Sequence, residues 1–420
     1  MPTLRAQSST MSSVASALPP FDTTKIALLC SGLGHVVRGH EVFARGLFDM
    51  MAGHVDIHLF KGAGDAADHE QTIACVKRGS PALDHAFAVA ASPQWANAVR
   101  EQARLNIEHE TFAYAALEPL LALQPAVVHC LEQEVCRVVH AHRHLFRNPP
   151  RILFSNGGAI PADALPPCDA VQEHTEYNLA GSLKDRAFCI PHGVDTQRFR
   201  PGVATEMRAR LDIPSDAFTI ISVGTVCFHH KRMDHVIREV AALPGAHLLI
   251  VGQDNQDTPA IHAIGREALG GRVHFMKLAH EELPQAYAAA DAFALGSLHE
   301  TFGIVYIEAM AMGLPVFCTN HPNQRSIVRE GVFVDMARPG ALAAALRDTR
   351  PERRAELGRR GREIAVAEYD LARLRQRYLQ AYRRIASLPL ALPATAPTQR
   401  LRAHLRHTLQ RTRRLFHGSH

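Results

Sequence analysis

The sequence predicts an α/β protein made of two successive doubly wound domains. From Lys25 onward, short apolar runs are separated by helical patterns, and within the runs apolar and polar residues do not alternate. Such runs indicate parallel strands that helices cover on both faces. The series stops in the proline- and glycine-bearing stretch 191–205 and then restarts, which indicates a second domain of the same class. A length of 420 residues is sufficient for both domains.

The elements follow in chain order. In the first series we expect a helix from Glu41, two helical segments between Gln94 and Leu123, and strands over 25–30, 54–60, 126–130, 151–156, 169–174 and 187–193. In the second we expect strands over 218–226, 247–253, 272–278, 292–297 and 315–320, and helices over 233–243, 339–348, 352–367 and 370–386. The predicted organisation is a disordered lead-in (1–22), a first domain (23–198), a second domain (199–368), a crossing helix (369–386) and a linker with a basic tail (387–420).

Positive charge is concentrated in the tail. Residues 389–420 carry six arginines and no acid, so the net charge of +5 falls to −1 without them. A neutral body predicts no nucleic-acid groove. Within 400–416, Leu401, Leu405 and Leu409 recur at every fourth position. This pattern is typical either of a basic amphipathic helix on an anionic membrane surface or of a solvated terminus.

The composition also indicates which cellular compartment and which cofactors to expect. The eight cysteines form no C-x-x-C pair, which indicates free thiols in a reducing compartment. No run approaches the ~18 apolar residues of a membrane-spanning helix, and the first 20 residues do not resemble a signal peptide. We therefore expect a cytoplasmic protein, with peripheral contact at the inner membrane face as a further expectation. His140 and His144 lack acidic partners, and no Walker motif or G-x-S-x-G elbow occurs, so no metal and no cofactor are expected.

The most informative stretch is 296–316, in which two glutamates bracket the start of a helix. A strand ends near Ser297, Glu300 lies in the following loop, and the helix begins near Gly303. Glu308 lies about one turn inside, and helical side chains lean toward the N-terminus, so both carboxylates can reach the same ligand. The free N–H groups of the helix start favour a phosphate between them. The pattern suggests a nucleotide sugar, whereas the alternative is a capping acid followed by a solvated helix acid.

At this point the chain resembles a known family. The stretch "SLHETFGIVYIEAMAMGLPV" (297–316) is similar to the E-x-F-G-x4-E signature of retaining glycosyltransferases of family 4, which have the GT-B fold with two Rossmann-like domains facing a central cleft. The resemblance continues in "CIPHGVDTQRFRPG" (189–202), "IISVGTVCFHHKRMDHVI" (220–237), "LLIVGQ" (248–253) and "YAAADAFALGS" (287–297), and it covers about 25–386.

The resemblance implies transfer of a sugar, with retained anomeric configuration, from a nucleotide diphosphate to a hydroxyl acceptor such as a glycan, a lipid-linked sugar or a polysaccharide precursor. It places Glu300 on the donor sugar and Glu308 on the ribose. The loop residues expected beside the donor are Thr301, Phe302, Gly303 and Ile304. Other expectations remain open: a GT-B epimerase or phosphorylase, or a nucleotide-sugar-binding protein without turnover.

A second donor contact is expected at the end of strand 218–226. Lys231 follows Gly224 after a short loop, where a lysine can neutralise a diphosphate, although a solvated loop lysine is the alternative. The family has Gly-Arg where this chain has Gly224-Thr225. The resemblance therefore leaves two residues for the second diphosphate contact, Thr225 and Arg232.

The first domain supplies weaker candidates. In "CSGLGHVVRGHE" (30–41), Gly32 and Gly34 form a G-x-G, but Val37 replaces the third glycine of a dinucleotide fingerprint. The resemblance brings this loop to the donor phosphates and the acceptor, with Arg38, His40 and Glu41 on the acceptor side. A plain tight turn is the alternative.

Two further segments bear on the predicted site. His129 ends strand 126–130 and resembles a family histidine near the sugar, with Glu132 as a weaker neighbour. A buried, hydrogen-bonded histidine is the alternative. The predicted catalytic set is Glu300, Lys231 and His129. In 319–328, Arg325-Ser326 replace the Pro-Glu of the family, so the identity of the donor is not carried over.

Overall fold

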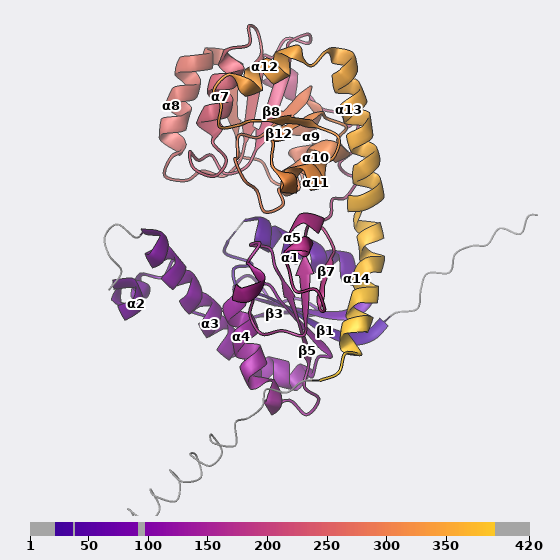
Figure 1. Cartoon of the computed structure of the whole chain (residues 1–420). Helices are drawn as coiled ribbons and strands as arrows, with labels where there is room; N and C mark the ends of the chain where they lie inside the picture. The colour runs from indigo at the N-terminus through magenta and orange to yellow at the C-terminus, as the bar shows by residue number, and fades with distance from the viewer. Residues whose placement is uncertain (1–21, 37, 91–96, 391–420) are drawn as a thin grey trace, which may run out of the picture.

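The computed structural model describes residues 22–36, 38–90 and 97–390 (Figure 1). The predicted lead-in and the leucine-spaced tail 400–416 lie outside these ranges. Within the described residues, no helix combines the length and the apolar character needed to cross a membrane. The chain forms two α/β lobes, and a pair of helices runs along one side of both (Figure 1). The predicted fold class is confirmed.

The first lobe contains a parallel sheet of seven strands in the order β3-β2-β1-β4-β5-β6-β7. Its strands are β1 (Asp22–Cys30), β2 (Val55–Lys61), β3 (Glu70–Thr72), β4 (Val127–Cys130), β5 (Arg151–Ser155), β6 (Ala170–Glu173) and β7 (Ala187–Cys189). Its helices are α1 (Gly39–Met51), α2 (Phe87–Ala90), α3 (Asn97–Leu123), α4 (Gln133–His142) and α5 (Glu176–Ala180).

The second lobe contains a parallel sheet of six strands in the order β10-β9-β8-β11-β12-β13. Its strands are β8 (Thr219–Val223), β9 (His247–Val251), β10 (Val273–Met276), β11 (Ala292–Ala294), β12 (Val316–Thr319) and β13 (Val332–Val334). Its helices are α6 (Met207–Arg210), α7 (Met233–Ala241), α8 (Thr258–Leu269), α9 (Leu283–Ala288), α10 (Ile304–Ala311), α11 (Pro322–Val328), α12 (Ala341–Asp348) and α13 (Pro351–Ile364).

Helices cover both faces of the first sheet, which explains its continuous apolar strands. One core joins the sheet to α1 and to α14 (Leu371–Ala386), and the other joins it to α3 and α4. Helix α14 follows the second lobe in the chain but packs on the first through Leu374, Tyr378 and Tyr382. The chain therefore crosses between the lobes twice, and the crossings are joined where the N–H of Val194 donates to the carbonyl of Tyr369 at 2.8 Å.

Several predicted elements differ from those observed. The two helical segments expected between Gln94 and Leu123 are wrong over the described part, because one helix, α3, runs from Asn97 to Leu123 with Pro119 inside it. The short strands β3 and β13 were not predicted. Each has only three residues, too few to show a period, and pairing with a neighbouring strand defines them.

Candidate active site

A cavity of about 980 Å³ lies between the lobes. From the first lobe it is lined by the loop after β1, including Gly34, and by α1, including Glu41 and Phe43. From the second lobe, His280, Ile304 and Glu308 line it, and the crossing residue His192 completes the wall. A ligand in this cavity would contact loops at the carboxyl ends of strands from both sheets, where doubly wound domains bind their ligands.

Glu300 and Lys231 meet in the second lobe, although 69 residues separate them. Lys231 Nζ donates to Glu300 Oε1 at 2.5 Å, and Ser297 Oγ donates to the same oxygen at 2.7 Å. His230 Nε2 lies 3.5 Å from Oε2. Glu300 is only 3% exposed, and an unpaired carboxylate would be costly there. The ammonium and the hydroxyl stabilise the charge and hold it in one orientation.

The glycine that ends β8 makes room for this lysine. Gly224 has φ +147°, and a Cβ built on it would lie 3.0 Å from Lys231 Cε. The lysine stem therefore passes directly over the end of the strand. A larger residue at this position would be strained by its φ and would require the lysine stem to shift.

Helix α10 begins between the two glutamates. Its N-cap is Gly303, with φ +83°, and no side chain caps the helix start. The first N–H groups of a helix lack intrahelical acceptors, so this end can receive an anion. Phe302 is buried behind it, whereas Thr301 is half-buried.

Glu308 lies on the first turns of α10 and faces the cavity. Tyr287 OH donates to Oε2 at 2.8 Å, and His280 Nε2 lies 3.0 Å from Oε1. Tyr287 is fully buried, so burial and the adjacent Glu308 charge raise the pKa of its hydroxyl well above the ordinary value. It remains a proton donor that fixes the carboxylate. Sequence reasoning missed both partners, because only the fold brings α9 and the loop before it to α10.

The two candidates for the second diphosphate contact differ in position. Arg232 Nη1 donates to the carbonyls of Met336 at 2.5 Å and Gly296 at 3.2 Å, so its guanidinium ties loops together inside the lobe. Thr225 is exposed at the end of β8. This geometry favours a structural role for Arg232 and leaves Lys231 as the cation nearest to Glu300.

The segment 319–328, which departs from the family pattern, donates hydrogen bonds to the backbone of the Glu300 loop. At the start of α11, Asn323 Nδ2 and Gln324 Nε2 donate to the carbonyl of Glu300 at 2.9 and 2.8 Å. Both side chains are fully buried. Sequence reasoning singled out Arg325-Ser326 in this segment, but the residues that contact the loop are the two before them.

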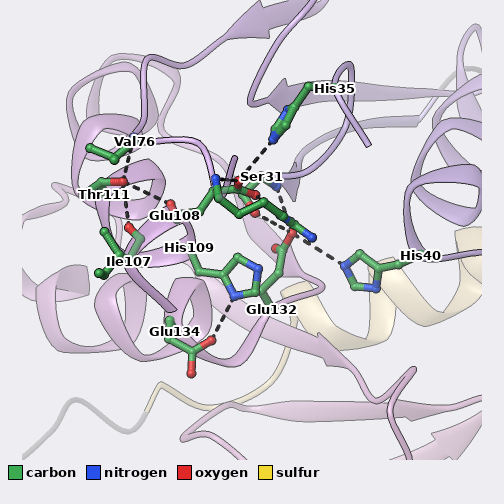
Figure 2. Close-up of polar contacts among 11 residues, drawn as sticks. Ser31, His35, His40, Val76, Ile107, Glu108, His109, Thr111, Glu132 and Glu134 are labelled. Carbon is green, nitrogen blue, oxygen red and sulfur yellow. Dashed lines mark hydrogen bonds and ion pairs between the residues drawn. The ribbon is translucent and has the colours of Figure 1, made fainter. Parts of the chain in front are cut away.

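On the first lobe, buried acids gather beneath the loop after β1 (Figure 2). Glu132 accepts hydrogen bonds from Ser31 N at 2.8 Å and Ser31 Oγ at 3.1 Å, and His40 Nε2 lies 3.5 Å from it. Burial would raise the pKa of Glu132, but His40 holds it below the ordinary value, and Glu132 in turn raises the pKa of His40. The two residues therefore stabilise each other's charged form.

A second buried acid secures the same loop from α3. Arg78 Nη2 and Nε donate to Glu108 Oε1 at 2.5 and 3.0 Å, and His35 Nε2 lies 3.1 Å from Oε2 (Figure 2). Glu108 is fully buried. Neither Glu108 nor Arg78 stands in a motif, so sequence reasoning had no signal by which to find them.

The two glycines predicted in this loop have separate steric roles. Gly34 has φ +96°, and a Cβ there would overlap the carbonyl of Ala63, so the loop can pack on the segment after β2 only with glycine. A Cβ on Gly32 would overlap the carboxylate of Glu41. Glu41 is 4% exposed, and its Oε2 has no hydrogen-bond partner among the described residues. Arg38, expected beside it, is the exposed N-cap of α1.

His129 is placed differently from the other predicted catalytic residues. It is fully buried, with Nε2 2.7 Å from Ser155 Oγ and Nδ1 2.9 Å from Tyr382 OH. Burial lowers its pKa to about 3. Both ring nitrogens are engaged, so the arrangement favours the alternative of a structural histidine, here one that links β4 and β5 to α14.

Four stacked or edge-packed rings connect the lobes beside the loop that carries Glu300. Sequence reasoning missed this feature. His174 and His192 stack with centroids 4.1 Å apart, and Phe43 of α1 packs edge-on against His192 at 4.7 Å. Phe302, next to Gly303, meets His192 at 4.8 Å. Burial lowers the pKa of His174 to about 3 and that of His192 well below its ordinary value. The stack is therefore neutral at pH 7.

Comparisons with known proteins agree with this geometry. Residues 203–364 match the family model described as glycosyl transferases group 1. The lipopolysaccharide core biosynthesis glycosyltransferase LpsE of Rhizobium meliloti (strain 1021) is 31% identical over 179 residues, 41% of this chain and 52% of LpsE. The matched region thus spans about half the length of that relative.

Solved structures extend the likeness to both lobes. Sucrose-phosphate synthase from Thermosynechococcus elongatus superposes with a TM-score of 0.70 at 21% identity, over 86% of this chain and 99% of that one. Anabaena Alr3699/HepE in complex with UDP and glucose superposes with a TM-score of 0.66 at 15% identity, over 86% and 100%. At these identities the likeness shows the fold. The chain therefore has the GT-B fold, and its residues 203–364 are similar to the glycosyl transferases group 1 family.

Proposed function

We propose that this chain is a retaining glycosyltransferase that moves a sugar from a nucleotide diphosphate to a hydroxyl acceptor. One observation carries the proposal: Lys231 and Glu300 meet beside the uncapped start of α10, while Glu308 of the same helix faces the cavity between the lobes. A cation, a helix start and two carboxylates match the phosphates and the two hydroxyl-rich parts of a nucleotide sugar.

The proposed donor lies across the second lobe. Its diphosphate meets the ammonium of Lys231 and the N–H groups after Gly303. Glu308 accepts the ribose hydroxyls, held by Tyr287, and Glu300 accepts hydroxyls of the transferred sugar. Complexes of Anabaena Alr3699/HepE with UDP and glucose or UDP-glucose support a donor of this class.

In the proposed reaction the bond between the anomeric carbon and the diphosphate oxygen breaks as the acceptor oxygen attacks from the same face. The leaving phosphate oxygen takes the acceptor proton, so no protein base is required. Lys231 and the helix start stabilise the charge that develops on the diphosphate. Glu300 is a hydroxyl ligand in this scheme and not a covalent nucleophile. We propose that these groups act without a cofactor.

The acceptor would enter from the first lobe, where Glu41 lines the cavity with one unpartnered carboxylate oxygen. LpsE is named for lipopolysaccharide core biosynthesis, which supports a saccharide acceptor. Contact of 400–416 with a membrane remains part of the proposal, and deleting 389–420 should weaken binding to anionic vesicles at low salt.

The test is a thermal-shift and turnover screen of nucleotide sugars on the wild type and on Lys231→Ala. Lys277→Ala is the matched control, since Lys277 pairs with Asp254 on the exposed surface. We expect one class of nucleotide sugar to raise the melting temperature of wild type and control, with a much weaker shift and ~10²-fold lower turnover in Lys231→Ala. Equal behaviour of Lys231→Ala and wild type would contradict the proposal.

Epimerised donor without an acceptor, or a demand for free phosphate, would favour the alternative GT-B reactions. Binding without any turnover would favour a binding protein.

A further inference from the structure

A cluster of metal-binding side chains lies on the first lobe, at the amino-terminal half of β2. Asp56 and His58 are two residues apart on this strand, so their side chains project from the same face. The parallel register pairs Leu59 of β2 with Glu70 of β3. One step back along both strands, His69 lies beside His58, and the backbone thus brings three ligand-type side chains together.

The distances between these side chains suit one shared ion. Asp56 Oδ1 lies 2.9 Å from His58 Nε2 and 3.6 Å from His69 Nδ1. One ligand atom from each residue lies within 4.8 Å of the others. Four-coordinate zinc with ligand bonds near 2.0–2.2 Å separates its ligand atoms by about 3.3–3.5 Å. The two measured separations lie on either side of that range.

The backbone and the side chain of His69 are both held by specific contacts. His69 has φ +56°, a left-handed conformation that non-glycine residues seldom adopt. Its carbonyl accepts the N–H of Leu59 at 2.8 Å, and its ring stacks on that of His58 with centroids 4.4 Å apart. This contact places the imidazole, which stays 43% exposed, against that of His58 over β2.

The remaining contacts of His69 also suit a metal. His69 Nδ1 lies 3.2 Å from the carbonyl of Ile57. If Nδ1 takes the metal, the ring proton moves to Nε2, which lies 3.8 Å from Asp68. A carboxylate behind a ligating histidine is the usual outer partner in such sites.

We propose that Asp56, His58 and His69 bind a divalent zinc ion, with a water in the fourth position. Two imidazoles and one carboxylate form a donor set that zinc favours over magnesium or calcium. The ion would join the short edge strand β3 to β2 and stabilise the segment 62–69 between them. The site is independent of the proposed transferase activity. It was not predicted from the sequence, because His69 is separated from the Asp-x-His pair by a loop.

The test is zinc titration by calorimetry on the full chain, tag-free and stripped with a chelator, together with Asp56→Asn, His58→Gln and His69→Gln. The control is His85→Gln, since His85 is an exposed histidine elsewhere on the lobe. We expect one zinc per chain for wild type and control, and at least tenfold weaker binding in each of the three variants. Asp68→Asn should weaken binding by ~10-fold. Zinc should raise the melting temperature of the wild type and not that of His58→Gln.

Cobalt absorption separates this site from the other candidate group in the described residues, Cys30, His40 and Glu132. Cobalt in the proposed site has only nitrogen and oxygen ligands, so we expect ligand-field bands without thiolate charge transfer. A thiolate band that disappears in Cys30→Ser would overturn the proposal and place the metal at Cys30, His40 and Glu132, beneath the loop after β1. Absence of stoichiometric zinc binding, or binding unchanged in all three variants, would overturn it as well.

Discussion

The two lobes form two walls of the candidate site, and these walls are built in different ways. On the second lobe, Glu300, Gly303 and Glu308 come from nine consecutive residues, and only Lys231 joins them from elsewhere. On the first lobe, Ser31, Arg78, Glu108 and Glu132 come from four separate segments. Local chemistry can be recognised as a sequence motif, whereas a network assembled by the fold cannot.

The walls also differ in how their charges are balanced. Glu108 and Glu132 are compensated by neighbours inside the first lobe, so these ion pairs serve structure. Lys231 and Glu300 compensate each other just before α10, whose first residue, Ile304, lines the cavity, and in the proposed function the donor takes over either partner. The same type of contact should therefore affect stability on one wall and donor binding on the other.

The largest expected effect is on the first wall. Arg78→Met leaves Glu108 buried with His35 as its only remaining side-chain partner in the described residues, and removing one partner of a buried pair costs about 3–5 kcal/mol. We expect a loss of this size in the free energy of unfolding, measured by urea denaturation. Lys231→Met should lose less stability, because Ser297 Oγ still donates to Glu300 and His230 lies 3.5 Å from its other oxygen. Equal losses in the two variants would remove the distinction between the walls.

Lowering the pH should destabilise the first lobe and the crossing segment before it destabilises the second lobe. His129 and His174 have pKa values of about 3 when folded against 6.5 when unfolded, so the unfolded chain binds more protons between these values. Stability from this source is complete above pH 6.5 and falls as the pH is lowered toward 3. At pH 5 each group should cost about 2 kcal/mol. Urea unfolding at pH 7 and pH 5 tests this, with His129→Gln expected to be less sensitive to acid.

On the second wall, Glu308→Gln should weaken the binding of the nucleotide-sugar donor without unfolding the protein. The amide keeps the shape and can still contact Tyr287 and His280, but it loses an acceptor for the ribose hydroxyls. We expect a ~10–30-fold higher Kd for the nucleotide sugar, about 1.4–2 kcal/mol, by calorimetry. Glu352→Gln on the exposed face of α13 is the control. A nucleoside diphosphate without ribose hydroxyls should bind both variants alike, and a difference there would contradict the assignment.

The smallest effect tests whether the second wall also depends on the fold. Gln324→Ala removes one of two donors to the Glu300 carbonyl and should cost about 1 kcal/mol of stability. If the loop position matters for catalysis, kcat should fall more than KM rises. Asn320→Ala, next to α11 and exposed, should change neither parameter.

Much of the second wall was predictable, because most of its site residues lie within one strand-loop-helix unit. Three proposals about single residues illustrate the limit. Lys231 was expected near the donor and contacts Glu300, but its neighbour Arg232 turns into the lobe because its backbone is left-handed, with φ +48°. His129, also at a strand end, points into the core. A strand end gives the position of a residue and not the direction of its side chain.

The order of residues by itself determined the fold class, the restart of the second domain and the donor motif, because hydrophobic periods and helix starts are local properties. Only the tertiary structure decided which acids are structural and which face the cavity. It also decided that Tyr287 holds Glu308, and that His69 lies beside His58. These contacts join residues 11 to 21 positions apart, or more, and they follow from strand register and packing, which local spacing does not encode.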